Sequence, residues 1–158
     1  MRDQLGPLRS AQLLMYSVDF GPVEQAQHAG RWDDTALILE DAARRLQAGG
    51  ADCVVLCTNT MHLVAPRIEA AGSVPFLHIA DPAGAAAVKA GTLTVGLLGT
   101  AFPMEQDFLK SRLAAQGLTV LVPEANERQA VHRIIYEELC VGVISEASRK
   151  VYQGVIES

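Results

Sequence analysis

The stretch that decides the fold is ADCVVLCTNTMH, residues 51–62. A short apolar run over residues 53–57 follows Gly49-Gly50 and ends in small polar residues. This pattern is typical of a buried parallel strand that passes into a loop and then a helix. In open α/β sheets, ligands bind outside the carboxyl ends of such strands. The stretch therefore predicts a functional site at residues 57–60, which supply a thiol, two hydroxyls and an amide.

Strand-like and helix-like patterns alternate along the rest of the chain. Strands are predicted at residues 11–18, 53–57, 74–79, 92–98 and 118–122. A first helix is predicted to end at Gly6, and a short one includes Gln25. A longer helix is capped by Asp33 or Asp34 and runs to Leu46, and another runs from Thr60 to Ala71, with Pro66 in its first turn or at a kink. The remaining helices cover residues 83–89, 103–113 and 127–140, and Ser145 caps a last one. The alternation predicts an α/β protein with a doubly wound parallel sheet.

Two regions of the chain are predicted as separate lobes, residues 1–82 and residues 83–158. The boundary is expected between Ile79 and Thr92, where a new strand starts a second sheet. The chain opens on what resembles the tail of a helix and stops within a helical pattern, so we expect an incomplete version of a longer protein. Apolar residues of the helical stripes, including Leu37, Val151, Val155 and Ile156, are expected to be buried.

Composition excludes several classes of protein. The hydrophobic fraction is 49%, which indicates a folded globular chain. A net charge of -5 and an aromatic fraction of 5% provide neither a basic surface nor a stacking platform, so nucleic acid is not an expected partner. No apolar run is long enough to cross a bilayer, and the first residues lack a signal-peptide pattern, so we expect no membrane association and a cytoplasmic location.

The three cysteines, Cys53, Cys57 and Cys140, are predicted to be reduced. Cys53 and Cys57 are too far apart on a strand for an easy disulfide. A metal site would need more ligands than His62, the one histidine nearby, so no metal is expected.

Several segments in the right order resemble the aspartate/glutamate racemase family, in particular its broad-specificity amino-acid racemase branch. The strongest match is LCTNTMH at residues 56–62. The other matches are SVDF at residues 17–20, VPFLHIAD at 74–81, LLGT at 97–100, MEQDF at 104–108 and YEELC at 136–140.

The resemblance implies two pseudo-symmetric, flavodoxin-like lobes and racemisation of acidic amino acids without pyridoxal phosphate, another cofactor or a metal. The resemblance also implies a pair of catalytic cysteines, the first in a Cys-Asn-Thr motif and the second in a Gly-Cys-Thr motif. Here Thr58 occupies the first catalytic position, and Cys57, one residue earlier, is the competing assignment. A Gly-Cys-Thr sequence does not follow, which implies that one catalytic partner is missing from this chain.

Substrate contacts are carried over from the same family to Gln27, Asn59 and Thr60. Each candidate also has a structural interpretation. Thr58 and its neighbours are good helix-capping residues, Cys57 is a small apolar group, and Gln27 is an exposed loop residue in that interpretation. His62 is expected to have a structural, supporting role. Gly99-Thr100 offers a weaker candidate anion site at another strand end.

The function predicted from these residues is that of a cofactor-independent amino-acid racemase, impaired or inactive in this truncated form. The expected partner is a small-molecule amino-acid substrate, and a homodimer is the expected assembly. One alternative is a related carbon-acid enzyme, such as a maleate isomerase or an arylmalonate decarboxylase. Another is a catalytically dead fragment that binds a ligand.

Overall fold

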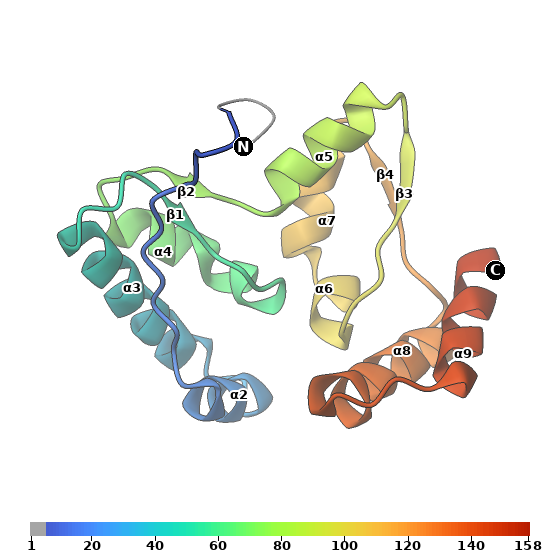
Figure 1. Cartoon of the computed structure of the whole chain (residues 1–158). Coiled ribbons are helices and arrows are strands. Elements are labelled where there is room, and N and C mark those ends of the chain that lie inside the picture. The colour runs from blue at the N-terminus through green and yellow to red at the C-terminus, as the bar shows by residue number, and fades with distance from the viewer. Residues whose placement is uncertain (1–5) are drawn as a thin grey trace. The chain divides into compact units, whose positions relative to one another are not determined.

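The computed structural model describes residues 6–158, so the helix end predicted before Gly6 lies outside the described residues. Close contacts group the chain into two compact units. One comprises Met1–Val54 with Val64–Phe76, and the other comprises Val55–Leu63 with Leu77–Ser158. Both are built from helices and short strands, which confirms the α/β class (Figure 1). The division into lobes 1–82 and 83–158 stays a prediction.

The first unit is mainly helical. Its helices are α2 (Phe20–His28), α3 (Trp32–Ala48) and α4 (Ala65–Ala71). The Asp19 carboxylate accepts a hydrogen bond from the Gly21 N–H at 3.1 Å and caps α2. Pro66 lies in the first turn of α4, as predicted. Backbone N–H groups have no partner within the helix at this position, so the missing N–H of proline costs no hydrogen bond. Helix α3 packs against both other helices.

The start and the buried face of α3 differ from the prediction. Arg31 is the N-cap residue, so the predicted cap at Asp33 or Asp34 is wrong; both carboxylates lie in the first turn instead, where they favour the helix dipole. Leu37 was predicted to be buried, but 55% of its surface is exposed. The buried stripe contains Ala36, Leu39 and Ala43, and Leu37 lies one residue, about 100°, around the helix from Ala36.

The strand predicted at residues 11–18 is absent, and this segment has no regular secondary structure. Its large apolar side chains are exposed, with Leu13 at 84% and Met15 at 90%. Apolar and aromatic residues favour a strand only where a neighbouring strand pairs with them. This segment has no place in the two sheets of residues 6–158, so the local propensity is not realised.

The other four predicted strands exist, but each is shorter than predicted. They are β1 (Val54–Val55), β2 (Phe76–Leu77), β3 (Thr94–Gly96) and β4 (Thr119–Leu121). Strand β1 pairs with β2, and β3 pairs with β4 in parallel, with Val95 opposite Val120. Each strand has one neighbour, so only its central residues complete the ladder, and the flanking residues continue as loops.

The second unit holds β3, β4 and the remaining helical elements. These are the 3₁₀ helices η1 (Thr60–Val64) and η2 (Leu139–Val141), and the helices α5 (Ala80–Lys89), α6 (Ala101–Glu105), α7 (Asp107–Ala114), α8 (Ala125–Glu137) and α9 (Glu146–Glu157). The core contains Ala80, Leu109, Leu113 and Leu118. Figure 1 shows α5 and α7 next to each other, in agreement with their packing contacts.

Three helix predictions need correction in this unit. Helix α5 begins at Ala80 and not after Pro82, because proline is tolerated in a first turn. The helix predicted over 103–113 is interrupted at Gln106, whose backbone is extended. The helix predicted over 127–140 ends at Glu137, and η2 follows it. In each case the helix exists, but its boundary was misplaced.

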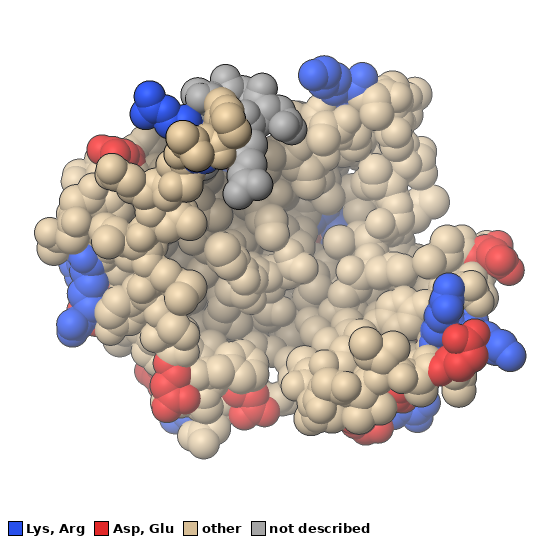
Figure 2. Space-filling model, viewed as in Figure 1, with Lys and Arg blue, Asp and Glu red and all other residues tan. Residues whose placement is uncertain are grey.

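Helix α9 begins as predicted and packs differently. The Ser145 hydroxyl accepts a hydrogen bond from the Ser148 N–H at 3.1 Å, which confirms the predicted cap. Val151 is 40% exposed and Ile156 is 70% exposed, so the prediction that they are buried is wrong. The apolar pattern made α9 amphipathic, but contacts within the described residues do not cover all of its apolar face. Figure 2 shows side chains of both signs next to one another over this helix.

Candidate functional site

The predicted site lies in the loop between β1 and η1. Strand β1 ends at Val55, so Cys57 and Thr58 do not point to opposite faces of a strand as expected, but follow it in irregular backbone. Cys57 is exposed, which contradicts its interpretation as a buried apolar group. Thr58 is half-buried, Asn59 is exposed, and Thr60 is the half-buried first residue of η1. The loop therefore presents thiol, hydroxyl and amide groups at the end of a strand.

The backbone of this loop is held by His62, whose side chain is 1% exposed. A turn formed by the His62 N–H and the Asn59 carbonyl oxygen, 3.1 Å apart, brings the ring back over the loop. The Ile79 N–H donates to Nε2 of His62 at 3.1 Å. Nε2 is therefore unprotonated, the proton is on Nδ1, and Nδ1–H donates to the Thr58 carbonyl oxygen at 2.6 Å.

A second buried histidine packs against this ring. His78 is 3% exposed, and its ring lies edge-on to His62 with centroids 4.3 Å apart. The Ala80 N–H donates to Nδ1 of His78 at 3.2 Å. Burial lowers the pKa of His62, and burial together with the neighbouring His62 and Arg112 lowers the pKa of His78 to about 4. Both imidazoles are therefore neutral at pH 7.

The helix that follows His78 is anchored by a charged pair. Arg112 on α7 donates to both carboxylate oxygens of Asp81 in the first turn of α5, at 2.7 and 2.8 Å. This bidentate geometry is the strong form of an arginine–carboxylate contact. The hydrogen bond from Arg112 is the main reason why the pKa of Asp81 is lowered. The pair fixes the start of α5, and with it the Ile79 N–H that meets His62.

A second strand end contributes another threonine. Thr100 follows β3 and precedes α6, and its hydroxyl lies 3.4 Å from the hydroxyl of Thr60. The Ala101 N–H donates to Nδ1 of His132 on α8 at 3.1 Å. A Cβ at Gly99 would lie 3.0 Å from Pro103 Cγ, so a side chain there would require the proline ring to shift by a few tenths of an ångström. The candidate anion site at Gly99-Thr100 therefore lies next to the loop of residues 58–60.

The structure brings some of the predicted residues together and places others elsewhere. Thr58, Asn59 and Thr60 share one loop, and Thr100 meets it. Gln27 belongs to the first unit, on α2, where it is 3% exposed, so it is not the exposed loop residue of the structural interpretation.

Sequence reasoning did not single out His78, Asp81 or Arg112. Asp81 precedes the helix predicted at residues 83–89 and was not placed in it. A helix start one turn earlier would have shown that its carboxylate lies in a first turn. Its partner on α7 lies 31 residues away, and no local pattern indicates that pairing.

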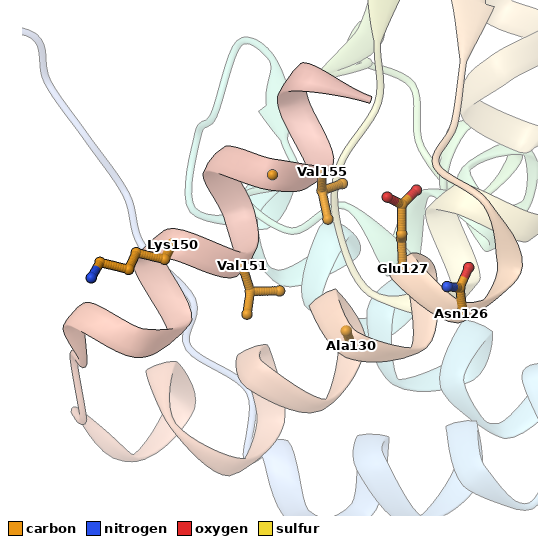
Figure 3. Close-up of a pocket in the computed structure, with 7 residues that line it drawn as sticks. Asn126, Glu127, Ala130, Lys150, Val151 and Val155 are labelled. Carbon is orange, nitrogen blue, oxygen red and sulfur yellow. The ribbon is translucent and has the colours of Figure 1, made fainter.

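Another concave surface lies between α8 and α9 and has different chemistry. A shallow pocket of about 360 Å³ is lined by residues that include Glu127, Ala130, Val151 and Val155. Figure 3 shows Lys150 extending away from Glu127. The Glu127 carboxylate already accepts a hydrogen bond from the Glu124 N–H in a capping box, so it completes a helix terminus. The strand-end loop is therefore the stronger candidate site.

Two further classes of site were searched for within residues 6–158. These residues contain no group of three or more His, Cys, Asp and Glu side chains placed to hold a metal ion. None of their helices is both long enough and apolar enough to span a membrane.

The fold and the polar strand end define an α/β protein with a candidate ligand site at the carboxyl end of a strand. The chain belongs to the Asp/Glu/hydantoin racemase family, whose model matches residues 1–158. This confirms the resemblance drawn from LCTNTMH and its companion segments.

Two solved structures are similar to this chain. One is a Yersinia pestis protein provisionally assigned as an Asp/Glu racemase, with 49% sequence identity and a TM-score of 0.90 over 99% of this chain and 68% of that one. The other is an aspartate racemase homologue from Pyrococcus horikoshii OT3, with 33% identity and a TM-score of 0.76 over 90% of this chain and 62% of that one. The chain thus spans roughly two thirds of the length of each of these proteins.

Proposed function

We propose that the protein is a cofactor-independent racemase of aspartate or glutamate that works by proton transfer at Cα. The observation that carries the proposal is the loop from Thr58 to Thr60, which presents polar groups at a strand end in a member of a racemase family. Racemisation requires a group on one face of the substrate to remove the Cα proton while a group on the other face supplies a new one. The carbanion formed between these two steps must be stabilised by fixed donors.

Thr58 is the proposed acid/base group on one face, with Cys57 as the competing assignment. The Thr58 side chain is half-buried, and its backbone is fixed by His62, whereas Cys57 is exposed. A fixed, partly desolvated group is better suited to proton transfer at a defined atom. A threonine hydroxyl stays protonated at neutral pH, whereas a thiol can lose its proton, so the threonine can donate a proton but does not supply the anion that abstraction needs. We therefore expect the two enantiomers to react at unequal rates.

Three residues are proposed to bind the substrate: Asn59, Thr60 and Gln27. The Asn59 amide is exposed in the loop, and the Thr60 hydroxyl lies beside that of Thr100. Together they offer donors for a carboxylate. Gln27 stays a predicted contact on the strength of the family resemblance. A cytoplasmic location and a homodimer stay predictions as well.

The test is proton NMR of L- and D-aspartate and glutamate in deuterated buffer with the purified protein and no added cofactor. Loss of the Cα–H signal and the ratio of enantiomers are followed together. Exchange with inversion supports the proposal. Exchange with retained configuration indicates one working base. Absence of exchange with this chain alone supports the expectation that it is impaired or inactive. Absence of exchange with acidic and neutral amino acids by the complete natural protein overturns the proposal, and maleate and an arylmalonate then test the two related carbon-acid activities.

A further inference from the structure

We infer that His62 is a positioning residue that fixes the main chain at residue 58 and thereby aims the side chain of that residue at the substrate. The inference rests on the proposed function for its catalytic consequence and on the geometry of the loop for its structural content. Nδ1–H of His62 donates to the Thr58 carbonyl oxygen, and Nε2 accepts from the Ile79 N–H.

The contact with Thr58 matters because the loop has little other regular support. The residues between the end of β1 at Val55 and the start of η1 at Thr60 belong to neither element, so their carbonyl groups need other partners. The ring supplies one partner at 2.6 Å and connects it, through its second nitrogen, to the start of α5. Holding a carbonyl restricts rotation about the preceding Cα–C bond. The direction of the residue 58 side chain is thereby restricted as well.

The connection works only while the ring is neutral. A second proton would occupy Nε2 and remove the acceptor of the Ile79 N–H. The new charge would also be buried, since His62 is 1% exposed. The groups that face the ring are His78, which packs edge-on against it, Arg112, which disfavours the charge, and Asp81, which favours it. We expect acid to break the link between the ring and the start of α5, while Nδ1–H still donates to the Thr58 carbonyl oxygen.

Two substitutions separate the two hydrogen bonds. In His62→Asn, the side-chain amide reaches the position of Nδ1 and keeps the bond to the Thr58 carbonyl. In His62→Gln, the longer side chain reaches the position of Nε2 and keeps only the bond from Ile79. Misplacement of a reacting group by about 1 Å can cost 10²-fold in rate. We expect kcat to fall at least about tenfold in His62→Gln, with KM changed less than about threefold. His62→Asn should stay close to wild type.

A matched control addresses loss of stability. Leu39→Ala opens the buried stripe of α3 in the first unit and should lower Tm without changing kcat. Equal losses of kcat in both His62 variants, or no loss in His62→Gln, would overturn the inference.

A readout without activity keeps the inference separate from the proposed function. The ¹⁵N chemical shifts of His62 should report a neutral ring protonated at Nδ1. The ¹³C shift of the Thr58 carbonyl should change in His62→Gln and much less in His62→Asn. If the complete natural protein exchanges no Cα proton, the proposed function fails, but these shifts still test the position of the ring. An Nε2-protonated or cationic ring at pH 7 would overturn the inference whatever the activity.

Discussion

In the second unit, two segments that follow strands are each held by a histidine, and the two histidines differ in how far along the chain they lie from the residue that they bind. Residues 56–60 follow β1 and residues 97–100 follow β3, and each segment carries a threonine hydroxyl close to the other. A histidine ring nitrogen holds the main chain in both places. His62 binds the Thr58 carbonyl, and His132 accepts from the Ala101 N–H.

The difference lies in where each histidine comes from. His62 follows Thr58 by four residues and is buried, so the first strand end is held mainly from within its own segment. His132 belongs to α8, 31 residues after Ala101, and is partly exposed, with its ring centroid 4.8 Å from that of Tyr136. The first segment should therefore respond to changes in its own sequence, and the second to the packing of α8.

Our proposal places the acid/base group in the first segment, and Thr58→Ala tests this most directly. Removal of an acid/base group typically costs 10²–10⁴-fold, so Cα proton exchange should fall by at least about 100-fold. Thr100→Ala removes the same atoms from the second segment and should cost less than about tenfold. Both rates are measured by NMR in deuterated buffer. If Cys57→Ala is the inactive variant and Thr58→Ala is active, the competing assignment is correct.

Acid should lower the stability of the protein through His62 and His78, the two histidines buried beside the first segment. The pKa of His78 is about 4 in the folded protein against 6.5 as its ordinary value. Between these values the unfolded chain binds more protons, so stability is lost as pH falls. His62, whose pKa is also lowered, adds in the same direction. The free energy of unfolding should fall by roughly 2–3 kcal/mol between pH 6.5 and 4.

Denaturant titrations at a series of pH values measure this fall. His78→Asn removes the titrating ring and keeps an acceptor for the Ala80 N–H, so it should flatten the dependence over this range. A variant with the slope of the wild type would show that other groups cause the acid sensitivity.

The second strand end should respond to the loss of its distant histidine. His132→Leu leaves the Ala101 N–H without its acceptor and should lower the free energy of unfolding by about 1 kcal/mol. His132→Asn presents an amide oxygen near the position of Nδ1 and should recover part of that loss. Denaturant unfolding of the two variants gives the difference. Equal destabilisation would show that packing against Tyr136, and not the hydrogen bond, is what matters.

The smallest expected effect concerns the anchor of α5. Asp81→Asn keeps the shape of the side chain and removes its charge, so the pair with Arg112 is weakened. Because Asp81 is 48% exposed and Arg112 is 38% exposed, the loss should be about 0.5–1 kcal/mol and smaller at high salt. Unfolding at low and high salt measures it. A loss that is insensitive to salt would contradict a Coulombic origin.

Local signals predicted the helices better than the strands. The Ser145 cap and the proline in the first turn of α4 are readable in a few consecutive residues, and both were confirmed. The strand expected at residues 11–18 depends on a pairing partner that local sequence cannot supply. Boundaries such as the break at Gln106 also depend on how neighbouring helices pack.

The candidate site was predictable in the same partial way. The loop at residues 57–60 was found because its polar groups are consecutive after an apolar run. The contact between His62 and Ile79 joins residues 17 positions apart, and the pair of Asp81 with Arg112 spans 31. Burial of Gln27 was missed because the apolar pattern of its helix is weak and glutamine is usually exposed.

The hydrogen bond from His62 ends on a main-chain oxygen, which every amino acid possesses. The contact therefore does not depend on the side chain of residue 58. A cysteine in place of the threonine would be held in the same way by an unchanged loop. The side chain of residue 58 can thus be exchanged for another without a matching change in the contact that orients its main chain.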